Sequence, residues 1–385
     1  MARPSILITS NFSNRTGFAW TAFFRVFNRI AREANERGVG VVLSFAEIEG
    51  EVDILDSDIP HEVIRFDPRN RTLSEVRGLM RNLRRHNVRY AYLTDYHSWN
   101  WLYAFMRLSG VRKILPHSHI SVASPYPAQP DRGFRRFAKT LLERSPLITA
   151  DHVLTCSQFV KNRLVDQARC PAERITVLNY GLPDSRFLDP RSRPTGAQDR
   201  PVRIFCASRA TKVKGVHRLI EATRILSERN DLPDFEVSYA GSGPDLDGFR
   251  EQASGLEDHF RFLGFLDDTT QELHAADIVV IPSEWGDAFP YSVLEALASG
   301  KAIVASRAGG IPEQVGSEAC GLLVPPGDAR ALADALETLI RDPEARRDMG
   351  VAAYARAMER FREEDYFQAV IDHVFDRLDI PAASP

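Results

Sequence analysis

The chain has 385 residues, 44% of them hydrophobic and 26% charged, and a formal net charge of −3. It contains no low-complexity tract, no repeat and no apolar run near the roughly 20 residues of a membrane span, so its composition indicates a globular protein. The start, four residues followed by a predicted strand, is not that of a signal peptide. A chain of this length is too long for one ordinary core, and two domains are expected.

Charge is unevenly spread along the chain. Residues 1–190 hold 27 Lys and Arg against 19 Asp and Glu, whereas residues 191–385 hold 22 against 33. The basic first half and the acidic second half are expected to have different partners.

The four cysteines lie far apart without metal-ligand spacing, which indicates free thiols in a reducing cytoplasm and no metal held by cysteine. They are Cys156, Cys170, Cys206 and Cys320.

The first half alternates predicted strands and helices. It opens with a strand over residues 5–9, a polar loop ending at Gly17 and a helix over residues 19–37. This is typical of the start of a doubly wound α/β domain, but the dinucleotide-binding glycine fingerprint is absent, so we expect Gly17 to line a cleft without binding a dinucleotide. The further predicted strands are residues 39–45, 63–66, 90–93, 112–115, 152–156 and 175–178, and the further predicted helices are residues 73–86, 99–109, 133–144 and 157–167.

A second alternation follows a linker. Residues 189–201 are rich in proline and polar side chains and lack periodicity, which predicts the linker. We therefore predict one α/β domain over residues 1–188 and a similar one over residues 202–362, with a cleft between them, and a final segment over residues 363–385. The predicted strands of the second domain are residues 202–207, 236–240, 260–265, 278–281, 302–306 and 321–324, with helix from residue 328 to about 378.

Carboxylates gather between Pro282 and Lys301, directly after a predicted buried strand. Glu284 and Asp287 lie in a loop, and Glu295 lies in the first turn of a helix predicted over residues 292–299. Because ligands bind at the carboxyl ends of strands in open parallel sheets, Asp287 and Glu295 are expected to face one cleft. The alternative is that these acids are solvated or favour the positive end of their own helix.

Cations and glycines follow two other strands of the second domain. Arg209 and Lys214, with Lys212 between them, stand at a predicted strand end and before a helix start, an arrangement that suits a diphosphate. A solvated basic loop is the alternative interpretation. Gly241 and Gly243 follow the next strand, where they would admit a ligand close to the backbone or simply form a tight turn.

Histidines mark a strand end in the first domain. His117 and His119 alternate along the chain, so both side chains are expected to point the same way. Asp95 and His97 end the neighbouring strand and could line the same cleft. These side chains would contact a sugar hydroxyl or a reacting centre, or they would be structural.

Basic residues are dense on two predicted helices of the first half. On the first of them Arg77, Arg81, Arg84 and Arg85 fall near one face, and basic and aromatic residues interleave over residues 133–144. Solvated faces are the default interpretation, and attraction to an anionic lipid surface or a phosphate-bearing acceptor is the sharper one. Nucleic acid is not expected, because no recognised binding module accompanies the charge. The acidic pairs Asp56/Asp58 and Asp245/Asp247 are interpreted as loop and cap residues.

Taken together, these motifs resemble the retaining nucleotide-sugar glycosyltransferases of family 4. The resemblance is carried by Arg209 with Lys214-Gly215, by the Gly241 to Pro244 turn, by Leu263-Gly264-Phe265, by the acids at 287 and 295, and by the Gly309 to Glu313 turn. The first half is similar more loosely, through His117-Ser118-His119, Asp151 to Ser157 and Asn179 to Gly181. The resemblance implies the GT-B fold, two Rossmann-like domains facing each other across a cleft.

The resemblance also implies roles. The second domain would bind a nucleoside-diphosphate sugar without a cofactor or divalent metal, with Arg209 and Lys214 on the diphosphate, Glu295 near the ribose and Asp287 on sugar hydroxyls. His117 would lie near the anomeric carbon, and the acceptor would be a glycan or a lipid-linked molecule. The final helix would pack back on the first domain. The donor-binding residues would be Arg209, Lys214, Gly241, Gly243, Gly264, Phe265, Asp287, Ala288, Phe289, Leu294 and Glu295.

Two residues depart from the family pattern. The first acid of the pair is usually Glu and is Asp287 here, and Pro290 offers no N–H where glycine is common.

We expect a cytoplasmic hexosyltransferase of polysaccharide or glycolipid synthesis, with peripheral contact to the inner membrane face through the basic half as an option. The alternatives are a sugar phosphorylase or epimerase on the same fold, and a catalytically silent relative that binds nucleotide sugar or glycan.

Overall fold

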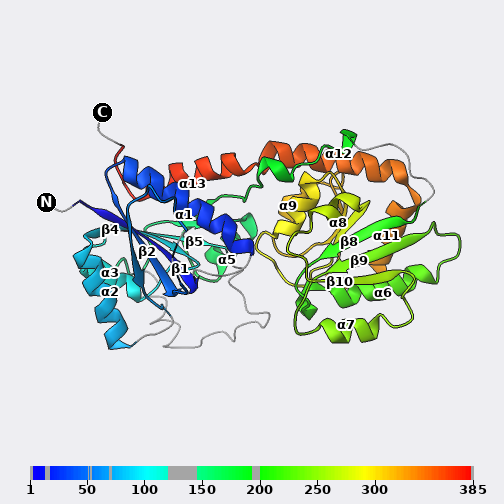
Figure 1. The fold of residues 1–385 in the computed structure, drawn as a ribbon, viewed down its shortest axis with the longest axis horizontal. Coiled ribbons are helices and arrows are strands. Elements are labelled where there is room, and N and C mark those ends of the chain that lie inside the picture. The colour runs from blue at the N-terminus through cyan, green and yellow to red at the C-terminus, as the bar shows by residue number, and fades with distance from the viewer. Residues whose placement is uncertain are drawn as a thin grey trace. The chain divides into compact units, whose positions relative to one another are not determined.

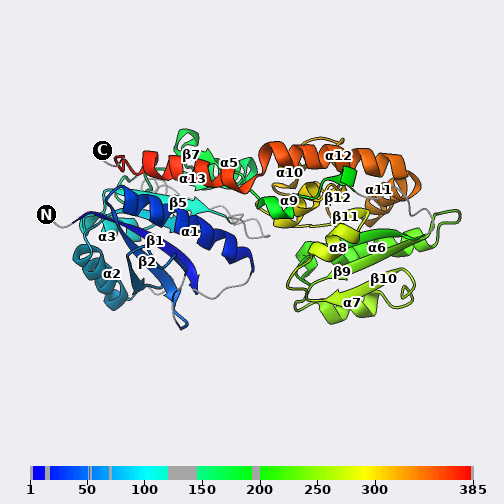
Figure 2. The ribbon, with the colours of Figure 1, turned by 45° about the horizontal axis from the view of Figure 1, so that its top comes forward.

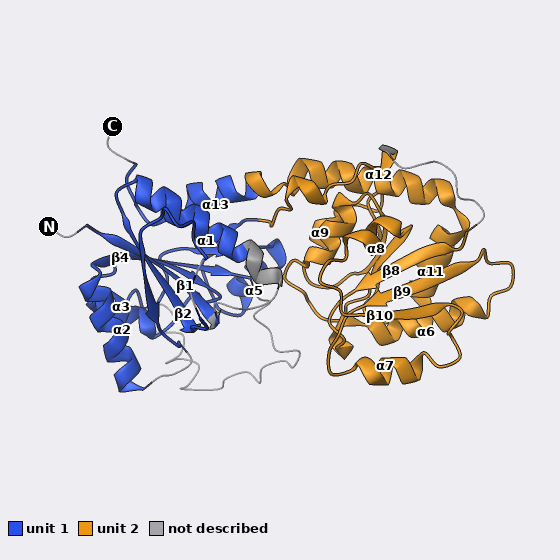
Figure 3. Ribbon diagram, viewed as in Figure 1, with its two compact units in different colours: residues 1–178, 366–385 blue, residues 179–365 orange. Residues whose placement is uncertain are grey.

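The computed structural model describes residues 3–13, 18–50, 52, 54–68, 72–119, 145–192 and 200–382. The chain forms two compact units, shown in separate colours in Figure 3: unit 1 is residues 1–178 and 366–385, and unit 2 is residues 179–365. The predicted features at Gly17 and over residues 133–144 lie outside the described residues.

The units divide the chain at other points than the predicted boundaries. Residues 179–188 join unit 2, because the Leu182 N–H donates to the Phe361 carbonyl at 2.8 Å and the Leu188 N–H to the Ala298 carbonyl at 2.9 Å. Residues 366–385 join unit 1, although they end the chain.

Unit 1 is built on a parallel sheet that has seven strands among the described residues, in the order β3-β2-β1-β4-β5-β6-β7 (Figure 1). The central strands are apolar on both faces, as is usual for parallel strands covered by helices. β5 is longer than predicted and includes His117, which pairs with Thr94 of β4. The strands are β1 (Ser5–Ser13), β2 (Gly40–Glu47), β3 (His61–Arg65), β4 (Val88–Thr94), β5 (Lys113–Ser118), β6 (Val153–Thr155) and β7 (Ile175–Val177).

Helices cover this sheet, and the last one comes from the end of the chain. α13 lies beside α1 in Figures 1 and 2, with the Arg29 guanidinium 5.4 Å from the centroid of the Phe367 ring and that of Arg37 4.4 Å from the centroid of Phe375. These cation–π contacts tie the C-terminal helix to α1 of unit 1. The helices among the described residues of this unit are α1 (Phe18–Glu36), α2 (Leu73–Arg85), α3 (Leu102–Leu108), α5 (Gln158–Asp166), the short η1 (Ala172–Arg174) and α13 (Glu363–Arg377).

Unit 2 holds a second parallel sheet, with six strands among the described residues in the order β10-β9-β8-β11-β12-β13. Every pairing in it is parallel, and the order reverses direction beside β8, the first strand of the unit. Such a reversal brings loops from two directions to one place at the carboxyl ends of the strands. The strands are β8 (Val202–Ala207), β9 (Phe235–Ala240), β10 (Phe260–Gly264), β11 (Ile278–Ile281), β12 (Ala302–Ser306) and β13 (Leu322–Val324).

The predicted long C-terminal helix of residues 328–378 is broken. α11 ends at Arg341, and the Asp342 carboxylate accepts the N–H groups of Glu344 and Ala345 at the start of α12. Phe361 caps the other end of α12. The helices of unit 2 are η2 (Asp184–Arg186), η3 (Pro190–Ser192), η4 (Lys212–Lys214), α6 (Val216–Ser227), α7 (Leu246–Gln252), α8 (Thr270–Ala275), α9 (Tyr291–Ala298), α10 (Ile311–Val315), α11 (Ala329–Arg341) and α12 (Pro343–Arg360).

The two sheets confirm the predicted α/β class with two doubly wound domains. In both sheets the candidate residues lie at or just after the carboxyl ends of strands, so that each unit presents its own group of polar side chains.

Candidate active site

An ion pair joins two loops of unit 2. The Lys214 Nζ lies 2.6 Å from the Asp287 Oδ1, and the Ser283 hydroxyl donates to the other carboxylate oxygen at 2.9 Å. Lys214 ends η4, after β8, whereas Ser283 and Asp287 follow β11. The two strands are neighbours in the sheet, so their loops meet. Asp287 therefore sets the position of Lys214.

The backbone holds these loops together without side chains. Gly215 has φ +72°, and a Cβ there would lie 1.9 Å from the Pro282 carbonyl oxygen, so only glycine fits. The N–H groups of Glu284 and Trp285 both donate to the Val213 carbonyl. The cation of Lys214 is thus carried by a rigid turn rather than by a mobile loop.

The predicted glycine turn lies beside this loop. A Cβ at Gly241 would be 1.9 Å from the Ser208 carbonyl oxygen, and one at Gly243 would be 2.5 Å from that of Ala210. The Gly241 N–H donates to the Gly264 carbonyl at 2.7 Å, which brings the end of β10 alongside. Next to it Phe265 is 68% exposed, a large apolar side chain left in solvent at a strand end.

Arg209 stands at the same edge with its side chain exposed. Within the described part of the chain its guanidinium makes no hydrogen bond or ion pair, in contrast to the ammonium of Lys214. The neighbouring Lys212 is also exposed, and its N–H donates to the Asp245 carboxylate at 2.7 Å. Asp245 stands at the N-cap position of α7 without a side-chain cap bond, and Asp247 lies in the first turn of that helix.

Glu295 occupies a different position from the predicted one. α9 begins at Tyr291 because Pro290, with ψ 131°, stands outside the helix, so Glu295 falls in the second turn and not in the first. Burial raises the pKa of Glu295 to about 7, and Asp268 adds to this while Arg186 opposes it. Its carboxyl makes no hydrogen bond with the described residues. A shielded carboxyl without a partner is available to a ligand.

Three predicted donor residues are core residues. Ala288, Phe289 and Leu294 are 9%, 3% and 0% exposed, so only their backbone could contact a ligand.

The Glu284 carboxylate is bound by two side chains of α6, Arg218 at 3.0 Å and His217 at 3.1 Å. It therefore serves to anchor its loop. Ser283 was not predicted as a site residue, although its position directly after a buried strand could have indicated it.

A second group gathers in unit 1, where β4 and β5 end. The Asp95 N–H donates to the His117 carbonyl at 2.9 Å, and the Asp95 Oδ1 accepts the His119 N–H at 2.8 Å. The His117 and His119 rings have centroids 4.0 Å apart, as their alternation predicted. Asp95 has φ +60°, an uncommon backbone conformation outside glycine. Among the described residues no contact joins the His97 ring to this group.

Burial keeps this group close to neutral. It lowers the pKa of His117 to about 3 and raises the pKa of Asp95 to about 7, and it lowers the pKa of His119 with a further contribution from His117. Both imidazoles are therefore neutral near pH 7. The Tyr92 hydroxyl, which was not predicted, lies 2.7 Å from the His117 Nδ1.

The strand ends of unit 1 also hold buried polar atoms without a hydrogen-bond partner among the described residues. Leaving such an atom unpaired costs about 1–3 kcal/mol, so several at one sheet edge indicate a place for a bound ligand or water. Sequence reasoning missed all except the histidine, because threonine and asparagine are common at strand ends. The atoms are Asn11 Oδ1, Thr94 Oγ1, His117 Nε2 and Thr155 Oγ1.

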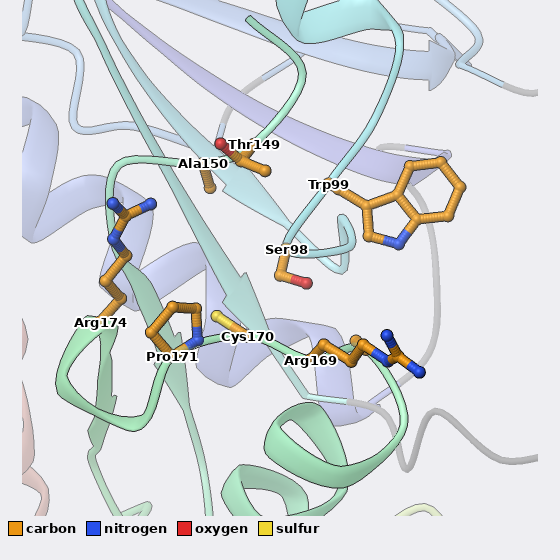
Figure 4. A pocket seen from close by; sticks show the side chains of 9 residues that line it. Ser98, Trp99, Thr149, Ala150, Arg169, Cys170, Pro171 and Arg174 are labelled. Atoms are coloured by element: carbon orange, nitrogen blue, oxygen red, sulfur yellow. The ribbon is translucent and has the colours of Figure 1, made fainter. Parts of the chain in front are cut away.

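A separate pocket of about 240 Å³ lies in unit 1 (Figure 4). Thr149 and Ala150 precede β6 and Cys170 to Arg174 precede β7, whereas Ser98 and Trp99 follow β4. Figure 4 shows Arg169 and Arg174 on opposite sides of it. Burial raises the pKa of the Cys170 thiol to about 11, which makes this thiol a poor nucleophile.

The described residues contain no group of three or more His, Cys, Asp or Glu side chains arranged to hold a metal ion. No helix among them is both long enough and apolar enough to cross a membrane. All four cysteines are buried and unbonded to one another.

Two family models match the chain. The model described as Glycosyltransferase Family 4 matches residues 24–186, and the one described as Glycosyl transferases group 1 matches residues 190–356. The first falls in unit 1 apart from its last residues, and the second lies within unit 2.

Curated relatives match in part. The chain is 30% identical over 236 residues to the amylovoran biosynthesis glycosyltransferase AmsK of Erwinia amylovora, covering 59% of this chain and 56% of that protein. It is 37% identical over 150 residues to the phosphatidyl-myo-inositol mannosyltransferase of Mycobacterium leprae, covering 38% of this chain and 39% of that protein. The matches therefore span about half the length of these relatives or less.

The fold has solved counterparts. The structure of Alr3699/HepE of Anabaena in complex with UDP matches with a TM-score of 0.72 and 22% identity, covering 97% of this chain and 100% of that chain. The same protein has been solved with UDP-glucose. The likeness concerns the fold. Since the two family models together cover most of both units, the chain belongs to the group 1 glycosyltransferases of family 4, which have the GT-B fold.

Proposed function

We propose that this protein transfers a hexose from a nucleoside-diphosphate sugar to a hydroxyl of a glycan or lipid-linked acceptor. The observation that carries the proposal is the Lys214–Asp287 pair at 2.6 Å, held on a glycine turn beside an Arg209 without a partner among the described residues. A leaving nucleoside diphosphate gains negative charge as its bond to the sugar breaks, and positioned cations at that point lower the barrier.

Each part of the unit 2 site has a task in this proposal. Arg209 and Lys214 bind the diphosphate, and the turn through Gly241 and Gly243 admits it close to the backbone. Phe265 offers an exposed ring near the base, and Glu295 accepts hydrogen bonds from the ribose hydroxyls. Asp287 contacts hydroxyls of the sugar, while its bond to Lys214 links sugar recognition to the diphosphate.

We propose retention of the anomeric configuration without a divalent metal. The two cations of unit 2 supply the positive charge that a metal would otherwise bring to the diphosphate. Polar atoms at the unit 1 strand ends, His117 among them, bind hydroxyls of the sugar or acceptor. The departing phosphate takes the proton of the acceptor hydroxyl, so a separate base is not needed.

The acceptor class draws support from relatives whose names refer to amylovoran biosynthesis and to mannosylation of phosphatidyl-myo-inositol. We further propose that α2 contacts an anionic membrane surface, because Arg77, Arg81, Arg84 and Arg85 are all exposed on it. Leu73, at the start of the same helix, is 72% exposed and could enter the lipid headgroup layer.

A thermal-shift panel of UDP-, GDP- and ADP-sugars, with and without EDTA, tests the donor class. We expect a rise in Tm for one donor that EDTA does not change. No shift with any donor would favour the silent relative, and product formed with inorganic phosphate in place of an acceptor would favour a phosphorylase. A shift that EDTA abolishes would refute the metal-free site.

A further inference from the structure

The buried Tyr92–His117 contact decides which ring nitrogen of His117 carries its proton. Tyr92 is 1% exposed and His117 is 0% exposed, and the phenol oxygen lies 2.7 Å from Nδ1. Among the described residues this is the only hydrogen bond of the Tyr92 hydroxyl. Burial raises the pKa of Tyr92, so the phenol keeps its proton.

Only one assignment of protons satisfies both groups. If Nδ1 donated to the phenol, the buried O–H would be left without an acceptor, at a cost of the order of a lost hydrogen bond. If the phenol donates to Nδ1, Nδ1 has its partner and the single imidazole proton resides on Nε2. Nε2 is itself buried and has no partner within the described residues. The Nε2–H group is therefore available to an acceptor atom of a ligand.

The surroundings hold the ring in this state. Phe27 meets Tyr92 edge-on at 6.3 Å between centroids, and Tyr92 meets His117 edge-on at 5.9 Å. The charged groups nearby are few: Asp95 is joined to the strand through backbone bonds, and its carboxylate accepts the His119 N–H. No described carboxylate contacts the His117 ring, so nothing there favours an imidazolium.

We propose that Tyr92 is a positioning residue that holds His117 as the Nε2–H tautomer, so that His117 donates a hydrogen bond to an oxygen of the bound sugar. His117 then acts as a donor and not as a base. The hydrogen bond to the sugar rests on the proposed function, whereas the tautomer is a property of the free protein. A sugar hydroxyl or ring oxygen satisfies the buried N–H, and its absence leaves that group unpaired.

Long-range ¹H–¹⁵N NMR of the ligand-free protein tests the tautomer without any substrate. We expect an unprotonated Nδ1 and a slowly exchanging Nε2–H on His117, and a shift toward a mixture of tautomers in Tyr92→Phe. Tyr103→Phe is the matched control, since it removes another fully buried phenol hydroxyl, one bonded to the His97 carbonyl. It should leave the His117 signals unchanged. A proton on Nδ1 in the wild type would overturn the inference.

Kinetics test the role in transfer. Tyr92→Phe should lower kcat about three- to tenfold with less than a twofold change in donor KM, the size expected for one neutral hydrogen bond. His117→Gln, which keeps an amide N–H near Nε2, should retain more activity than His117→Asn, which keeps only the side facing Tyr92. Equal loss in both variants would indicate a base and refute the donor role. If the tautomer is as proposed but no sugar nucleotide is used, the proposed function fails alone.

Discussion

At the scale of single residues, folding and donor binding favour different protonation states of Glu295. Burial raises its pKa to about 7, so the folded state binds this proton more tightly than the unfolded chain does. The associated stability is present at acidic pH and is lost as the pH rises toward and through 7. Glu295→Gln should therefore have a higher Tm than the wild type at pH 8 and no advantage at pH 5, measured by scanning calorimetry.

The same variant should bind the donor more weakly. Ribose hydroxyls favour the charged carboxylate, so wild-type affinity for the nucleotide sugar should rise between pH 6 and 8, while Glu295→Gln should show little change. The carboxylate that faces Glu295 does not titrate in this range, because the pKa of Asp268 is lowered to about 2. Parallel pH profiles for both proteins in a binding titration would contradict the role of Glu295.

At the scale of elements, the turn between η4 and α6 both stabilises unit 2 and positions Lys214. Gly215→Ala should destabilise the protein by at least about 1–2 kcal/mol from the left-handed backbone alone, and it should displace Lys214. Gly248→Ala is the control, since that glycine lies on α7 with nothing within 4 Å of an added Cβ and should gain about 0.5–1 kcal/mol. Urea denaturation measures both. A tolerated Gly215→Ala would show that the turn is not tight.

The exposed basic face of α2 gives a second prediction for an element. Reversing Arg77, Arg81, Arg84 and Arg85 to Glu should weaken binding to vesicles with anionic lipid, by roughly 1 kcal/mol for each charge near the surface. Reversal of four exposed arginines of unit 2 should have little effect in the same sedimentation assay. An equal loss of vesicle binding in the two variants would mean that binding depends on net charge and not on α2. The control residues are Arg250, Arg261, Arg330 and Arg347.

At the scale of the whole molecule, the chain ends in the unit in which it starts. Phe375 on α13 is 2% exposed and packs under Arg37 of α1. Phe375→Ala should cost about 3–5 kcal/mol of unit 1 stability, whereas Asp372→Ala on the exposed side of the same helix should cost little. Hydrogen exchange should show the loss in unit 1 amides. Loss spread equally over unit 2 would contradict this division.

Much of this architecture could be predicted from the sequence, because buried parallel strands such as Ile278–Ile281 are short apolar runs with clear ends. That Lys214 and Asp287 each follow such a strand could be read from the sequence, but their ion pair depends on β8 and β11 being neighbours in the sheet. Details that depend on tertiary contact could not. α9 starts one residue before the predicted helix, which places Glu295 at its fifth position, and the Tyr92–His117 bond joins strands whose register no local pattern reveals.

In the proposed function, the Lys214 cation stabilises a departing nucleoside diphosphate. Transfer from the preferred donor should therefore be measured in Lys214→Ala beside Arg250→Ala, an exposed cation on α7 of the same unit. We expect a fall in kcat of about 100- to 1000-fold for Lys214→Ala and wild-type turnover for Arg250→Ala. Unchanged turnover in folded Lys214→Ala would contradict it.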